Sequence, residues 1–104
     1  MYGTGRGIPQ DDAEAVRWHR LAADQGLGEA QINLGISYAD GRGVPQDNVQ
    51  AHMWFNLAAS RMTGENRESA VRLRDRVAEE LTPDDLSEAQ RLAREWDAVH
   101  PREP

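Results

Sequence analysis

Histidine is the residue type in this chain best suited to bind a metal ion or to transfer a proton, and there are three: His19, His52 and His100. None has a second ligand at a helical metal-site spacing such as His-Glu-x-x-His. We therefore interpret all three as exposed histidines and predict no metal site and no cofactor. On this interpretation, replacing His52 should cost little stability.

Carboxylates gather near the carboxyl end of the chain, where a cation could be expected. They span a helix end, a turn and a helix start, whereas a calcium loop alternates its ligands around a central glycine. We interpret them as helix caps and solvated surface charge. The group comprises Glu79, Glu80, Asp84, Asp85 and Glu88.

Two glycine-rich stretches, GTGRG and DGRGV, look like phosphate-binding loops. Each precedes an acidic residue suited to cap a helix, so turn geometry explains the glycines better. The chain has no lysine and no cysteine, which excludes Schiff-base chemistry, the phosphate-loop lysine and thiolate nucleophiles. We predict no catalytic residue and no enzyme activity.

Composition indicates one acidic domain of 104 residues with a formal net charge of -6. An acidic protein repels phosphate backbones and anionic lipids, so neither nucleic acid nor a membrane is expected as a partner. No apolar run is long enough to span a bilayer, and the stretch MYGTGRGIPQ lacks the features of a signal peptide. We expect a soluble chain.

The chain repeats itself. At an offset of 36 residues, the stretch from Tyr2 to Ala23 and the stretch from Tyr38 to Ala59 are identical at 12 of 22 positions. Both contain a tryptophan, Trp18 and Trp54. Because the tryptophans recur with the module, we predict that they are core anchors and not platforms for stacking a ligand.

Each copy contains a turn followed by a helix. In the second copy, Gly41 can end a helix in the left-handed conformation, and Gly43 allows a further turn. Val44 is predicted to reach the core, and Asp47 and Gln50 have the spacing of a capping box. The next helix has one apolar stripe, formed by Ala51, Trp54, Leu57 and Ala58 and repeated as Ala15, Trp18, Leu21 and Ala22.

The helix before this turn has two apolar faces when wound at about 100° per residue. One face contains Leu27, Ala30, Leu34 and Tyr38, and the other contains Ile32, Ile36 and Ala39. A helix with two apolar faces is typical of the interior of a stacked array, because it packs against neighbours on both sides.

These residues resemble the consensus of Sel-one-like repeats, a family of helical hairpins related in form to tetratricopeptide repeats. The resemblance covers residues 2 to 61. It rests on Leu34, Gly35, Tyr38, Gly41, Gly43, Val44, Asp47, Ala51, Trp54, Ala58 and Ala59.

The resemblance implies an all-α superhelical solenoid. We expect helices over residues 12–24, 28–39, 48–60, 66–80 and 84–98. A single solenoid domain would comprise a partial repeat (2–26), a full repeat (27–62), a degenerate repeat (63–81) and a capping helix (82–99), followed by a disordered tail (100–104). In the capping helix, Thr82 is the N-cap and Pro83 takes the first position.

The resemblance also implies an adaptor or scaffold that binds a protein or peptide. Arrays of this kind commonly bind with the surface lined by the first helix of each repeat. On that helix, the wedge between the two apolar faces holds Glu29, Asn33, Ser37 and Asp40, which we predict to contact the partner. The alternatives are a carboxyl-terminal structural fragment of a longer scaffold and a hydrolase of the kind proposed for cysteine-rich relatives.

The amino-terminal edge has only part of a hairpin. The helix that carries Trp18 lacks a partner helix before it, so the side that would pack there is expected to stay open. We expect either a longer array in which a preceding repeat covers this side, or self-association near Tyr2, Ile8, Val16 and Leu21.

Overall fold

The computed structural model describes residues 12–101, and the regular elements of this range are all α-helices. They are α1 (Asp12–Asp24), α2 (Gly28–Asp40), α3 (Asn48–Arg61), α4 (Gly64–Ala78) and α5 (Pro83–Ala98). The predicted helices are confirmed with bounds that differ by two residues at most. The largest differences are at α4, which begins at Gly64 because Thr63 already has the extended backbone of an N-cap.

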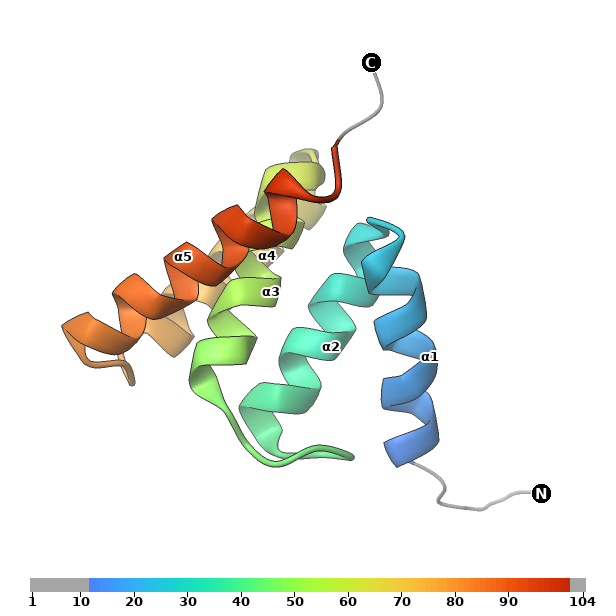
Figure 1. Ribbon diagram of the computed structural model, residues 1–104, viewed down its shortest axis with the longest axis horizontal. Coiled ribbons are helices and arrows are strands. Elements are labelled where there is room, and N and C mark those ends of the chain that lie inside the picture. Colours follow the sequence, from blue (N-terminus) through green and yellow to red (C-terminus); the bar gives the residue numbers. More distant parts are fainter. Residues whose placement is uncertain (1–11, 102–104) are drawn as a thin grey trace.

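Helix α3 is the centre of the array. It packs against α2, α4 and α5, while α1 packs against α2 (Figure 1). Helices α2 and α3 are therefore each packed against more than one helix, whereas α1 is packed mainly against α2, and α4 and α5 mainly against α3. This difference decides which residues of the repeat are buried.

The turn between α2 and α3 has the predicted chemistry. Gly41 ends α2 with a left-handed φ of 70°, and its N–H donates to the carbonyl of Ser37. Asp47 caps α3, because its carboxylate accepts from the backbone N–H of Gln50 at 3.1 Å. Val44 packs against the core, as predicted.

Helix α2 packs with both of its apolar faces, although Leu27, predicted on one of them, is 57% exposed at the start of the helix. Ala30 and Leu34 belong to a cluster with Trp54 and Leu57 of α3. On the opposite side, Ile32 and Ile36 pack against the cluster that contains Phe55 and Val77. Ile32 also packs against the cluster that contains Ala58. The two-faced prediction is therefore confirmed, and α2 is an interior helix. Gly35, between the faces, lets the ring of Phe55 approach the α2 backbone.

The apolar stripe of α3 is completely buried: Ala51, Trp54, Leu57 and Ala58 are exposed by 2% or less. Trp54 packs edge-to-face against Trp96 of α5, with ring centroids 5.8 Å apart. Its prediction as a core anchor is confirmed.

The corresponding stripe of α1 is not buried, and here the sequence interpretation is wrong. Trp18 is 64% exposed and Leu21 58% exposed, although they occupy the repeat positions of Trp54 and Leu57. The reason is the neighbourhood: among the described helices, α1 packs mainly on α2, whereas α3 is enclosed by three helices. Val16, predicted at the open edge, is instead buried at 5% exposure. Tyr2 and Ile8 lie outside the described residues.

His52 is also placed differently from the prediction. It is only 3% exposed, and no hydrogen-bond partner reaches its Nδ1 atom. His52 follows Ala51 directly, so its side chain lies on a different side of α3 from the Ala51 stripe. Helices α4 and α5 cover α3 on this side. Burial lowers the pKa of His52 below its ordinary value of 6.5, and the charge of Arg74 lowers it further, while Asp75 opposes the shift.

The lowered pKa predicts how stability depends on pH. The unfolded chain protonates His52 more readily than the folded chain. The contribution of neutral His52 to the free energy of unfolding is therefore complete above about pH 6.5, and it is lost as the pH falls toward the folded-state pKa. Between pH 7 and pH 5, the wild type should lose more stability than His52→Gln, by at most ~1.4 kcal/mol per pH unit. Urea unfolding of both proteins at each pH measures the difference, and identical pH slopes would contradict it.

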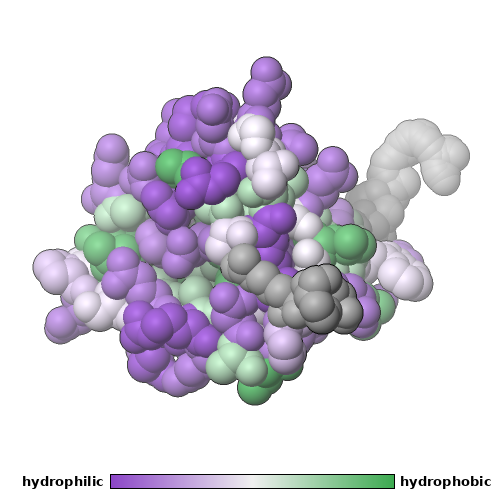
Figure 2. Space-filling model, turned by 90° about the horizontal axis from the view of Figure 1, so that it is seen from above, coloured by the Kyte–Doolittle hydropathy of each residue, from purple (hydrophilic) through white to green (hydrophobic). Residues whose placement is uncertain are grey.

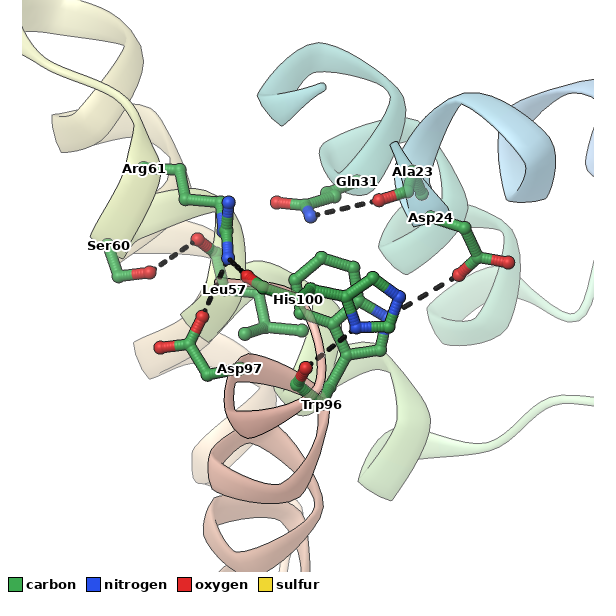
Figure 3. Close-up of polar contacts among 9 residues, drawn as sticks. All are labelled: Ala23, Asp24, Gln31, Leu57, Ser60, Arg61, Trp96, Asp97 and His100. Atoms are coloured by element: carbon green, nitrogen blue, oxygen red, sulfur yellow. Dashed lines mark hydrogen bonds and ion pairs between the residues drawn. The ribbon is translucent and has the colours of Figure 1, made fainter. Parts of the chain in front are cut away.

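The end of α5 is fastened to the rest of the array by Arg61 (Figure 3). The Arg61 guanidinium donates to Asp97 at 2.8 Å and to the carbonyl of His100 at 2.9 Å, and it lies 4.9 Å from the ring centroid of Trp96. The His100 ring stacks on Trp96 at 3.8 Å. His100, the first residue of the predicted disordered tail (100–104), thus contacts both Arg61 and Trp96, and residues 102–104 lie outside the described range.

Candidate partner-binding groove

Two adjoining hollows run along α1 and α2. One, of about 270 Å³, lies between the start of α1 and the second half of α2. The other, of about 410 Å³, lies at the start of α2 beside the end of α3. They share His19 of α1 and Asn33 of α2. We call the two hollows together the α1–α2 groove.

The structure brings three of the four predicted partner-binding residues into this groove. Asn33 lines both hollows, Glu29 lines the hollow at the start of α2, and Ser37 lines the other. Their spacing of four residues aligns them along one side of the helix. Asp40 lines neither hollow and is exposed at the end of α2.

His19 is the groove residue that the sequence interpretation missed. It comes from α1 and is half-buried, and its Nδ1 atom is enclosed without a hydrogen-bond partner. The equivalent position in the next repeat is Phe55, which is 1% exposed. A polar residue at a position that is apolar in the other copy was the available signal.

The groove combines hydrogen-bonding groups with apolar surface. Ile36 lies beside Ser37 in one hollow, and Leu27, 57% exposed, borders the other together with Met62. At the outer end, Arg42 and Asp12 form an exposed ion pair at 4.0 Å, which contributes little stability. Glu29, in the first turn of α2, contributes negative charge.

This arrangement is suited to binding. The amide of Asn33, the hydroxyl of Ser37 and the imidazole of His19 can each donate and accept hydrogen bonds, as a peptide main chain requires. Mixed apolar and polar lining is typical of recognition surfaces. Across residues 12–101, no three histidine or acidic side chains lie together as metal ligands would.

The predicted acidic group near the carboxyl end has ordinary partners. Thr82 caps α5 by accepting from the N–H of Asp85 at 3.1 Å, and Glu88 forms an ion pair with Arg91 at 2.6 Å. These contacts support the interpretation as capping and surface charge. Gly43, in the glycine-rich loop, has a positive φ of 81°, which supports its role in a turn.

The face of the molecule drawn in Figure 2 is mostly hydrophilic, and apolar residues form small separate patches on it. None of the described helices is long and apolar enough to cross a membrane.

Comparison with known proteins agrees with this architecture. The family model described as Sel1 repeat matches residues 1–27 and 28–61. A crystal structure of a protective antigen present in uropathogenic Escherichia coli strains, displaying an SLR fold, is similar with a TM-score of 0.82 and 33% sequence identity. The similarity covers 92% of this chain but 20% of that protein, so the chain spans about a fifth of its length. No curated protein sequence matches significantly. The predicted all-α solenoid is confirmed.

Proposed function

Because the chain belongs to the Sel1 repeat family, we propose that it is a non-enzymatic protein-interaction module, whose partner binds in the α1–α2 groove. The observation that carries the proposal is the continuity of the groove: Asn33 and His19 join two hollows into one elongated surface. An elongated surface with hydrogen-bonding groups along one helix fits a segment of another protein better than a compact small molecule.

The partner would use both kinds of contact in the groove. Its main chain would hydrogen-bond to Asn33 and Ser37, whose side chains make no hydrogen bond with another described residue. An apolar side chain of the partner would pack on Leu27 and Met62, in the larger hollow. Glu29 would favour a partner with a basic residue near this apolar contact.

The proposal predicts that substitutions in the groove weaken binding of the partner without unfolding the protein. The triple variant Glu29→Gln, Asn33→Ala, Ser37→Ala should retain the helical circular dichroism of the wild type, because these side chains lie off the buried clusters. Binding to the partner should weaken at least ~10-fold, since several hydrogen bonds are removed.

The chain supplies a matched control with the same three chemical changes outside the groove. Glu65→Gln, Asn66→Ala, Ser87→Ala alters exposed residues of α4 and α5. Quantitative affinity capture from extracts of the source organism should recover a protein with the wild type and the control, but not with the groove variant. Equal recovery by all three proteins would contradict the groove as the binding site, and loss of helicity in the groove variant would show that its residues are structural.

The second candidate function is that of a structural piece within a longer scaffold. The exposed Trp18 and Leu21 favour it, because they occupy positions that are buried between helices in the next repeat. In that case, contacts with another repeat would depend on Trp18, and the groove triple variant would change no interaction.

A further inference from the structure

A second pair of hollows lies between α3 and α5, apart from the α1–α2 groove. One, of about 230 Å³, extends toward the end of α5. The other, of about 330 Å³, is bordered on one side by α4. They adjoin at Asn56 of α3 and Gln90 of α5, which line both, and we call the two hollows together the α3–α5 recess. No residue of α1 or α2 lines it.

The recess contains a buried polar side chain with no partner. His52 lines its inner part and is 3% exposed, yet it makes no hydrogen bond with another described residue, and its Nδ1 atom is enclosed. Buried polar groups in native proteins are nearly always hydrogen-bonded. Because the Nδ1 atom itself is enclosed, a ligand in the recess could meet only the part of the His52 ring that borders the hollow.

The available groups of the recess are mainly hydrogen-bond donors, from Asn56, Gln90 and Arg94. The Asn56 carbonyl oxygen already accepts from Arg74 at 3.3 Å, so its amide N–H groups remain for a ligand. Gln90 and Arg94 form no hydrogen bond or ion pair with any other residue of the range 12–101. The recess can thus offer two amide groups and one guanidinium.

The acidic residues of the recess are already neutralised. Asp75 forms an ion pair with Arg74 at 3.1 Å. Asp97 binds Arg61 at 2.8 Å, the contact that fastens the end of α5 (Figure 3). With both carboxylates engaged, the unpaired charge in the recess is the positive charge of Arg94, which selects an anionic ligand rather than a cation.

We propose that the α3–α5 recess is a binding site for a peptide carboxylate, held by the Arg94 guanidinium and the side-chain amides of Asn56 and Gln90. A carboxylate has the planar pair of acceptor oxygens that a guanidinium binds in bidentate fashion. The peptide main chain next to it would lie along Asn56 and Gln90, toward the hollow that His52 borders. The site does not depend on the partner proposed for the α1–α2 groove.

Short peptides test this site and distinguish the two sources of a carboxylate. The probes are acetyl-Ala-Ala-Ala-Ala with a free carboxyl terminus, acetyl-Ala-Glu-Ala-Ala-amide, and the neutral acetyl-Ala-Gln-Ala-Ala-amide, each titrated into the ¹⁵N-labelled full chain in 150 mM salt. At least one carboxylate peptide should shift the side-chain amide signals of Asn56 and Gln90, and the neutral peptide should bind at least ~10-fold more weakly.

Two variants of the same helix provide the matched control. Arg94→Gln should weaken binding of the carboxylate peptide ~10-fold, because it removes the charge in the recess. Arg91→Gln removes the same charge from another exposed position of α5, where Arg91 is paired with Glu88 and Glu95, and should leave affinity unchanged. Equal loss in both variants, equal binding of the neutral peptide, or no shift of Asn56 and Gln90 with any peptide would overturn the proposal.

Discussion

Trp54→Ala should lower the free energy of unfolding by about 3–5 kcal/mol, whereas Trp18→Ala should lower it by less than about 1 kcal/mol. The two tryptophans occupy the same position of the repeat, but Trp54 is 2% exposed and Trp18 is 64% exposed. Truncating Trp54 would leave a cavity between α3 and α5 and would remove the edge-to-face contact with Trp96. Truncating Trp18 would remove a side chain that is largely in water.

Urea unfolding monitored by circular dichroism measures both variants against the wild type. Because residue type, substitution and repeat position are the same, the comparison isolates the effect of burial. Comparable losses in the two variants would mean that Trp18 is covered in solution by another molecule or segment. Sedimentation of the wild type and of Trp18→Ala would then show whether a second copy provides the cover.

Gly35→Ala should destabilise the protein by about 1–3 kcal/mol, although alanine is the better helix former. A Cβ atom on Gly35 would lie 2.5 Å from Cε1 of Phe55 and 2.7 Å from its Cδ1. Phe55 is 1% exposed, so its ring has no free space to enter. Helices α2 and α3 would have to separate to accommodate one methyl group.

Gly28→Ala is the matched control for this effect. It is also a helical glycine of α2, and a Cβ atom there would lie 2.4 Å from Cγ of Met62. The Met62 side chain is flexible and only half-buried, so it can rotate away. Because alanine has the higher helix propensity, the free energy of unfolding of Gly28→Ala should be at most about 1 kcal/mol below that of the wild type. Thermal unfolding that ranks Gly28→Ala as the less stable variant would contradict this account of the α2–α3 contact.

The sequence alone determined the five helices to within two residues at each end, together with several of their caps. The stripe containing Trp54, the two faces of α2 and the Asp47 cap depend on residue spacing within a few turns of helix. Such local information is complete in the sequence, because helical geometry places residues three and four apart on one face. The same spacing placed Glu29, Asn33 and Ser37 together along α2, where the structure finds them in one groove.

Tertiary structure alone decided which equivalent positions are buried. Trp18 and Trp54 have the same local sequence, yet the number of helices packed around each sets its exposure. His52 is buried because α4 and α5 cover its side of α3, whereas the equivalent Val16 of α1 is buried in a different cluster. His19 lies in the groove because α1 packs beside α2, and Arg61 donates to the carbonyl of His100 across 39 residues of sequence. The burial of a side chain depends on the helices packed around it, and a repeated sequence pattern does not specify how many helices surround each copy of the repeat.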